Sequence, residues 1–236
     1  MMAVRPVFMV CYDLPYTRTE EITFKYHSGM ALSQAQKSIQ SLHQAFEELH
    51  PEFAGKIIEI STKSTTPLGI KLSAFNLQYM KPNGFHYSVE NIFQAGKCFE
   101  NGQQYTDLLK VSAYEAKKDP RLRESGRVIA FKLDDEEFPT YPRTLFYDWI
   151  YVNALAQNED LSKEVLGFEA FTDIAFNPKK SINCQAQSAS LFVSLKRKGL
   201  LQQAISSKEE FERIVYVAQE QKDYSSEQLS LFDYYE

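Results

Sequence analysis

The sequence predicts an α+β fold: a single helix-rich domain with a small sheet and a flexible C-terminal tail. The chain has 236 residues, of which 44% are hydrophobic and 24% charged, which is enough for one domain with a sizeable core. Most segments with regularly spaced apolar residues show the helical period, and few alternate as strands do. From residue 223 onward the composition is polar and tyrosine-rich, with no core periodicity.

The first quarter of the chain contains three predicted strands and one helix. These elements are strands at 5–12 and 19–26, a helix at 33–49 and a strand at 56–61. In the second strand Ile22, Phe24 and Tyr26 alternate with polar residues, which is typical of a strand. In the helix apolar side chains recur every three or four positions up to Leu49, and Pro51 follows, so we expect the helix to end there.

The rest of the chain is predicted to be mainly helical. Its elements are helices at 88–100, 106–118, 147–156, 160–167, 184–197 and 207–221, with one strand at 128–133. Ser207 and Glu210 form a capping box that starts the last helix. The predicted domain therefore spans 1–205, followed by a C-terminal helix at 206–222 and a flexible tail at 223–236.

The cysteines and the hydropathy pattern limit the class of protein. The three cysteines are far apart, form no CxxC pair, and lack metal-ligand spacing with the four histidines. We therefore expect reduced thiols in a cytoplasmic protein, with no bound metal and no cofactor. No apolar stretch is long enough for a membrane span or a signal sequence.

The charge is distributed unevenly along the chain. Residues 206–236 carry eight acidic against three basic side chains, so they account for the whole net charge of −5. Residues 1–205 therefore carry no net charge. A general nucleic-acid binder needs an excess of positive charge, because its affinity comes largely from phosphate neutralisation. Any nucleic-acid function must therefore come from a local pocket.

The segment 88–97 carries the most informative group of residues. On a helix, Glu90, Gln94 and Lys97 share one narrow stripe, and Val89, Ile92 and Phe93 form the adjoining apolar face. A carboxylate and an amine held in line can act as general acid/base and as nucleophile. The alternative is an ordinary amphipathic helix with a solvated polar stripe.

The pattern VExxFQxxK at 89–97 resembles the signature helix of the NADAR family of N-glycosidases. Three further matches occur in order: LSAFN at 72–76, EAKK through GR at 115–127, and Asn183 before an apolar helix. Together they cover about residues 56–200. The N-terminal part, with HSGM at 27–30, resembles the NADAR branch paired with DarT-type DNA toxins.

This resemblance implies an enzyme that removes ADP-ribose from guanine bases in DNA and thereby acts as an antitoxin to a cognate DarT-type toxin. Glu90 would be the general acid/base and Lys97 the nucleophile that forms a Schiff base. An ordinary lysine is only about one part in 2,500 neutral at pH 7. The site must therefore desolvate Lys97 or place another cation beside it.

Several residues are expected to bind the substrate. A hydroxyl-rich turn at 61–64 and a basic loop at 179–180 suit a diphosphate, although both fit solvated loops equally well. Asp173 and Asn177 fit Asx turns, with ribose or base contacts as the alternative. The full predicted set of substrate-binding residues is Ser61, Lys63, Ser73, Phe75, Asn76, Gln94, Asp148, Trp149 and Asn183.

The tail contains the sequence QLSLF, made of Gln228, Leu229, Ser230, Leu231 and Phe232, which resembles the motif that binds the bacterial DNA sliding clamp. Delivery by the clamp would bring a near-neutral domain to replicating DNA. The alternative is a tail that folds back onto the domain through its apolar residues.

Two other functions stay open at this stage. The chain resembles enzymes that cleave ribosylamine intermediates of the riboflavin pathway as well. A catalytically idle antitoxin that neutralises its toxin by direct binding is the third possibility. The extended N-terminal part and the clamp-like tail favour the DNA enzyme, because a metabolite hydrolase needs neither.

Overall fold

The structure is a computed structural model that describes residues 1–179 and 181–216. Its central feature is a four-stranded sheet with the strand order β2-β1-β9-β3. The strands are β1 (Met2–Val10), β2 (Thr17–Lys25), β3 (Ile57–Glu59) and β9 (Ala170–Thr172). β1 runs antiparallel to β2 and β9, whereas β3 and β9 are parallel. The carboxyl ends of β3 and β9 therefore lie side by side.

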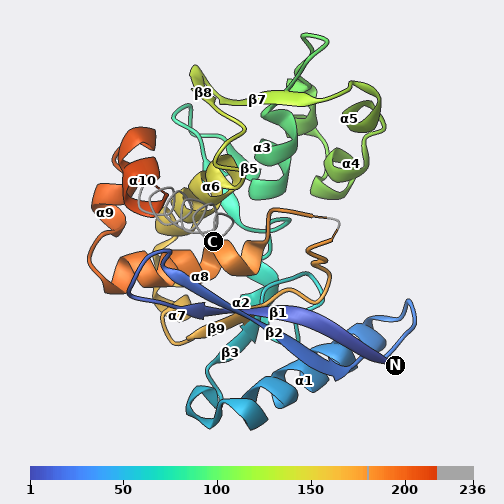
Figure 1. Cartoon of the computed structure of the whole chain (residues 1–236). Helices are drawn as coiled ribbons and strands as arrows, with labels where there is room; N and C mark the ends of the chain where they lie inside the picture. The colour runs from blue at the N-terminus through green and yellow to red at the C-terminus, as the bar shows by residue number, and fades with distance from the viewer. Residues whose placement is uncertain (180, 217–236) are drawn as a thin grey trace, which may run out of the picture.

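Side chains that alternate along these strands enter two separate cores. On one face, Val7 and Phe24 pack with Phe46 of α1 (Leu32–Leu49). On the other face, Phe8 and Phe171 join a larger core built around α6 (Leu145–Ala156) and α8 (Gln185–Arg197). Figure 1 shows α1 and α8 on opposite sides of the sheet. The alternation thus decides which strand residues can approach α1 and which face the rest of the molecule.

A second group of short elements lies beyond α6, at the top of Figure 1. It contains the sheet β6-β7-β8, made of β6 (Lys97–Phe99), β7 (Val128–Leu133) and β8 (Glu136–Phe138), and the hairpin of β4 (Gln78–Met80) and β5 (His86–Ser88). Its helices are α3 (Val89–Ala95), η2 (Thr106–Lys110), α4 (Ala113–Lys118) and α5 (Arg121–Glu124).

Short helices complete the described part of the chain. These are η1 (Pro51–Phe53), α2 (Pro67–Lys71), α7 (Glu159–Val165), α9 (Leu201–Ala204) and α10 (Lys208–Val215). Between the two groups, α6 is buried almost all round, as an apolar core helix should be. Within the residues described, the structure contains no helix whose length and hydropathy would suit a membrane crossing.

The predicted α+β class and the excess of helix over strand are confirmed, but several boundaries differ. The helix expected at 106–118 is interrupted, because η2 ends at Lys110 and Ser112 caps a new helix, α4. Sequence reasoning missed the short helices η1, α2, α5 and α9 and the three-residue strands β4, β5, β8 and β9. Three residues are too few to show an alternation. The part of the predicted last helix beyond Tyr216 lies outside the described residues.

The helix expected at 88–100 was predicted too long, and this error concerns the site directly. α3 ends at Ala95, and after Gly96 the chain enters strand β6 at Lys97. The carbonyl oxygen of Gly96 accepts a hydrogen bond from Lys132 N at 2.7 Å, which starts the pairing of β6 with β7. A Cβ atom on Gly96 would lie 2.7 Å from the ring of Phe146 and 2.9 Å from the carbonyl oxygen of Lys132. Only glycine fits this turn.

We predict that Gly96→Ala lowers the free energy of unfolding by about 1–3 kcal/mol, because the added methyl group overpacks the turn. Urea denaturation at pH 7 measures this. Gly167→Ala is the matched control, since its Cβ would meet nothing closer than 3.4 Å. It should change the free energy of unfolding by no more than about 0.5 kcal/mol. Equal effects of the two substitutions would contradict the tight turn.

Candidate active site

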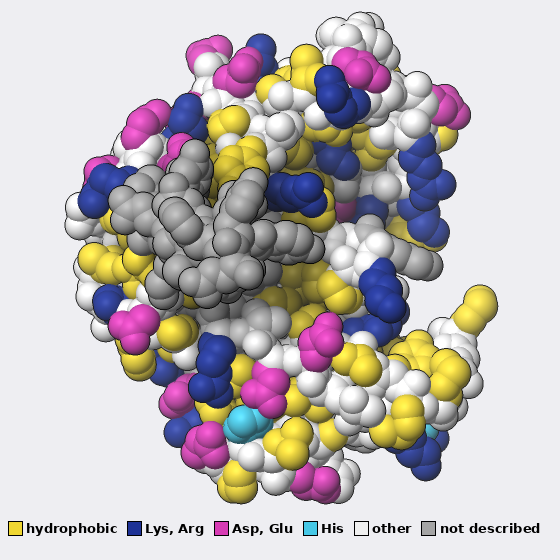
Figure 2. Space-filling model, viewed as in Figure 1, with side chains coloured by type: hydrophobic (Ala, Val, Ile, Leu, Met, Phe, Trp, Pro, Cys, Tyr) yellow, Lys and Arg dark blue, Asp and Glu magenta, His cyan; other side chains and the backbone are white. Residues whose placement is uncertain are grey.

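A cavity of about 510 Å³ lies between the four-stranded sheet and the group of elements around α3. Figure 2 shows the surface hollowed on its right side, with Lys and Arg side chains gathered on both sides of the hollow. The cavity lies within the usual size range of small-molecule sites. Its lining residues are Ser61, Thr62, Lys63, Ala74, Phe75, Glu90, Phe93, Gln94, Lys97, Lys117, Asp119, Leu122, Arg123, Tyr147, Asp173, Ala175, Phe176, Ser181, Asn183 and Gln185.

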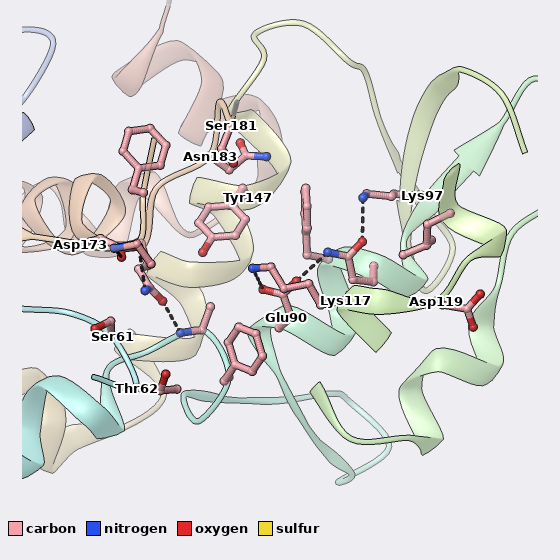
Figure 3. A pocket seen from close by; sticks show the side chains of 18 of the residues that line it. Ser61, Thr62, Glu90, Lys97, Lys117, Asp119, Tyr147, Asp173, Ser181 and Asn183 are labelled. Atoms are coloured by element: carbon pink, nitrogen blue, oxygen red, sulfur yellow. Dashed lines mark hydrogen bonds and ion pairs between the residues drawn. The ribbon is translucent and has the colours of Figure 1, made fainter. Parts of the chain in front are cut away.

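The cavity lies at the carboxyl ends of the parallel strands β3 and β9. Ser61, Thr62 and Lys63 follow β3, and Asp173 and Ala175 follow β9. In α/β proteins ligands bind outside the carboxyl ends of parallel strands, where the connecting loops diverge. The short parallel pair thus supplies one wall of the cavity, and α3 with α4 supplies the opposite wall (Figure 3).

The first turn of α3 is fixed by hydrogen bonds from outside the helix. Ser88 accepts a hydrogen bond from Asn91 N at 3.1 Å and so caps the helix. Val89 N and Glu90 N donate to the carbonyl oxygens of Leu77 and Ala74, at 3.0 and 2.9 Å. The segment 74–77, which precedes α3 in the chain and is followed by the β4–β5 hairpin, therefore satisfies these two free N–H groups. As a result Glu90 is held at the floor of the cavity and is only 3% exposed.

Glu90, Gln94 and Lys97 form a continuous hydrogen-bonded chain. Gln94 Nε2 donates to Glu90 Oε1 at 2.6 Å, and Lys97 Nζ donates to Gln94 Oε1 at 2.7 Å (Figure 3). Lys97 Nζ also lies 4.9 Å from the centre of the Phe93 ring. The three residues lie together although Lys97 is on strand β6, because the turn at Gly96 keeps its side chain beside the end of α3.

A second lysine approaches Glu90 from α4. Lys117 Nζ lies 3.4 Å from Glu90 Oε2 and 5.0 Å from the centre of the Phe75 ring. Burial lowers the pKa of Lys97 to about 8; the charge of Glu90 opposes this shift, and that of Lys117 adds to it. At pH 7 about one Lys97 side chain in ten is then neutral. The desolvation and the neighbouring cation expected from the sequence are both present.

The wall opposite α3 presents hydrogen-bond acceptors. Asp173 Oδ2 accepts from Gln185 Nε2 at 2.9 Å, and its Oδ1 accepts from Ala175 N at 3.0 Å. Burial raises the pKa of Asp173 above its ordinary value. The Oδ1 atom of Asn183 is buried and has no hydrogen-bond partner among residues 1–179 and 181–216. A buried acceptor left free in a cavity wall is suited to a donor group of a ligand.

Seven of the residues predicted from the sequence line this cavity: Ser61, Lys63, Phe75, Glu90, Gln94, Lys97 and Asn183. Six of them lie within residues 61–97, and Asn183 is distant in the sequence. Ser73 and Asn76 do not line it. Ser73 Oγ and Asn76 Nδ2 both donate to the carbonyl oxygen of Ile70, at 2.7 and 2.9 Å, so they close the end of α2.

Asp148 and Trp149 are also placed away from the cavity. Asp148 accepts hydrogen bonds from Ser188 Oγ at 2.5 Å and from Tyr216 Oη at 2.7 Å, on the far side of α6. Trp149 packs edge-to-face on Phe211 of α10, with ring centres 5.5 Å apart. The reason is the helical period. Tyr147 faces the cavity, so the next two residues are turned away by about 100° and 200°.

The lining residues outside the predicted set include Lys117, Arg123, Tyr147 and Asp173. The stretch 115–127 did resemble the family, which was a signal for Lys117. The Asx turn expected at Asp173 is present, yet the same carboxylate also faces the cavity. Its exposure to the cavity was missed because the three-residue strand β9 was not recognised.

Two other expectations concern metals and the tail. Over 1–179 and 181–216, no group of three or more His, Cys, Asp or Glu residues could hold a metal ion. Lys180 of the predicted basic loop and the sequence QLSLF at 228–232 lie outside the described residues.

Comparison with known proteins gives one family. A search of curated proteins finds no match to the chain. The family model for the DarT1-associated NADAR antitoxin matches residues 3–225. This span includes both walls of the cavity and nearly the whole of the 236-residue chain. The chain therefore belongs to the DarT1-associated NADAR antitoxin family.

Proposed function

We propose that this antitoxin is an N-glycosidase that removes ADP-ribose from guanine bases in DNA. The observation that supports it best is the partly buried hydrogen-bonded chain of Glu90, Gln94 and Lys97 in the cavity wall, in which burial lowers the pKa of Lys97 to about 8. An amine that is partly neutral at pH 7, linked to a carboxylate, is equipped to attack an anomeric carbon.

The proposed reaction uses both groups. Lys97 Nζ attacks the anomeric carbon of the ribose, and the bond from this carbon to the guanine nitrogen breaks. Glu90 takes the proton released by the attacking amine and gives it to the departing nitrogen, so guanine leaves neutral. The ribose ring opens to a Schiff base on Lys97, and water then hydrolyses it. The products are ADP-ribose and unmodified guanine, and Lys97 is regenerated.

The cations of the cavity support a substrate that contains phosphate. Lys63 follows β3, and Arg123 lies on α5 at the opposite side of the opening. The backbone N–H of Lys63 donates to Ser61 Oγ at 3.1 Å, which folds the loop after β3 into a turn at the cavity wall. The choice of guanine in DNA rests on the association of the family with the DarT1 toxin. A riboflavin-pathway ribosylamine and a purely binding antitoxin are the alternatives that the experiments must separate.

We predict that Glu90→Gln lowers the rate of ADP-ribose release from a guanine-modified oligonucleotide by about 10²–10⁴-fold, the usual effect of removing a general acid/base. Lys97→Arg, which keeps the positive charge but is never neutral near pH 7, should abolish release. Glu159→Gln is the control, because this exposed glutamate pairs with Lys163 and does not line the cavity.

The same variants distinguish the alternatives. A binding antitoxin would keep its ability to neutralise the toxin in cells when Glu90 is replaced, whereas an enzyme would lose it. A metabolite hydrolase would release nothing from modified DNA even as the wild type. Either result would contradict the proposed function.

The pH dependence should follow Lys97. We predict that the rate rises with pH and levels off above about 8, where Lys97 becomes mostly neutral. Lys117→Met removes a cation that disfavours the charged form of Lys97, so the pKa of Lys97 increases and the rise moves to higher pH. Lys118→Met is the control on the same helix, since Lys118 contacts Tyr114 instead. A profile for Lys117→Met that moves to lower pH would contradict the assignment.

We also propose that the sequence QLSLF at 228–232 binds the bacterial DNA sliding clamp. Deleting residues 228–232 should abolish capture of the purified clamp in a pull-down while leaving ADP-ribose release from a free oligonucleotide unchanged. Deleting residues 233–236 is the matched control and should leave clamp binding intact. Clamp binding that survives the first deletion would show the motif to be unrelated to it.

A further inference from the structure

One side chain joins the two walls of the cavity. Gln185 is the first residue of α8. Its Nε2 atom donates to Asp173 Oδ2 at 2.9 Å, and its Oε1 atom accepts from Ala74 N at 2.7 Å. Asp173 belongs to the wall that follows β9, whereas Ala74 belongs to the segment that holds the first turn of α3. Figure 3 draws the hydrogen bond that leaves Asp173 as a dashed line.

The neighbours of Gln185 determine which way its amide group is turned. A backbone N–H only donates, so the amide oxygen must face Ala74 and the NH₂ group must face Asp173. The other oxygen of Asp173, Oδ1, accepts from the backbone N–H of Ala175 at 3.0 Å. Both carboxylate oxygens are therefore acceptors, and each keeps a lone pair for a further donor. Burial raises the pKa of Asp173, while these two hydrogen bonds and the charge of Lys117 oppose that shift.

The chain just before Gln185 places a second acceptor on the same wall. Cys184 has an extended backbone, with φ −136° and ψ 119°, and its side chain is buried in the larger core. Because side chains alternate along an extended segment, Asn183 and Gln185 both point into the cavity. The Oδ1 atom of Asn183 has no hydrogen-bond partner among the described residues. This wall therefore calls for donor groups on the ligand.

The other end of the bridge leads to the proposed reaction centre. The carbonyl oxygen of Ala74 accepts from Glu90 N at 2.9 Å. Asp173 is thus linked to Glu90 through Gln185 and Ala74, and all four residues line the cavity. In the proposed reaction the attacked ribose carbon lies beside Glu90. Hydroxyl groups on the neighbouring carbons of that ring supply donors there, whereas phosphate groups offer acceptors.

We propose that Gln185 is a positioning residue, which holds the carboxylate of Asp173 in the wall facing α3 as an acceptor for the hydroxyl groups of the ribose ring that reacts. This inference rests on the proposed function and names the part of the substrate that this wall binds. It divides the cavity into acceptors for the sugar and cations for the phosphates.

Calorimetric titration of the full chain with ADP-ribose and with ADP tests the inference, because ADP lacks only the distal ribose. Asp173→Asn should lower the ratio of the two affinities about tenfold, since hydrogen bonds to a charged acceptor are lost. Gln185→Met is close in size but bonds to neither neighbour, and it should lower the same ratio about fivefold. Gln187→Met is the matched control on α8, because Gln187 does not line this cavity, and it should leave the ratio unchanged.

The effects of the two substitutions should not add. Once Asp173→Asn is present, Gln185→Met should change the ratio no further, because the acceptor that Gln185 positions is already gone. A residue that merely stabilises α8 would act equally in both backgrounds. Thermal unfolding of each variant checks that it is folded. Gln185→Glu is a second variant, which keeps an acceptor for Ala74 N and removes only the donor to Asp173, and it should also lower the ratio.

Three results would overturn the inference: a wild type without a preference for ADP-ribose over ADP, an unchanged ratio in folded Gln185→Met or Gln185→Glu, or an effect of Gln185→Met that adds fully to that of Asp173→Asn. Failure of the proposed function looks different. In that case the wild type releases no ADP-ribose from modified DNA, whatever the affinities of the two ligands.

Discussion

One constraint shapes the proposed active site: an amine and a carboxylate are held together in a partly desolvated cavity wall. Glu90 is fixed because the free N–H groups of the first turn of α3 donate to the preceding segment. Gln94 then carries the contact to Lys97, and the ring of Phe93 lies against the amine. Desolvation and the charge of Lys117 lower the pKa of Lys97, so that part of the Lys97 population is neutral near pH 7. The charge of Glu90 opposes this lowering of the pKa. Without this arrangement the same residues would form an ordinary solvated stripe.

The two parts of the fold supply different halves of the site. The sheet brings the loops after β3 and β9 together, because these strands are parallel neighbours. The group around α3 supplies the proposed reacting residues and is joined to the sheet through the buried helices α6 and α8. Two acidic residues at the sheet also face different ways. Strand alternation sends Glu59 toward α1 and Asp173 toward the cavity, and burial raises the pKa of both carboxyl groups.

Local patterns predicted the strands β1 and β2, the helix α1 and the start of α3, because each has a clear period or a capping residue. They also predicted that Glu90, Gln94 and Lys97 lie together. The end of α3 could not be predicted from the period, because it is set by the packing of Gly96 on Phe146, far away in the sequence. Asp173 was missed as a cavity residue for a similar reason: β9 is three residues long and is defined only by its neighbours.

The most direct test of the central claim is to trap the covalent intermediate. The purified protein is incubated with a guanine-ADP-ribosylated oligonucleotide and cyanoborohydride, and the intact masses of the protein and the DNA are measured. We expect release of ADP-ribose from the DNA together with a reduced adduct on the protein that maps to Lys97 and is absent from Lys97→Arg. Release of ADP-ribose with no adduct, or an adduct on another lysine, would contradict the role of Lys97 as the nucleophile.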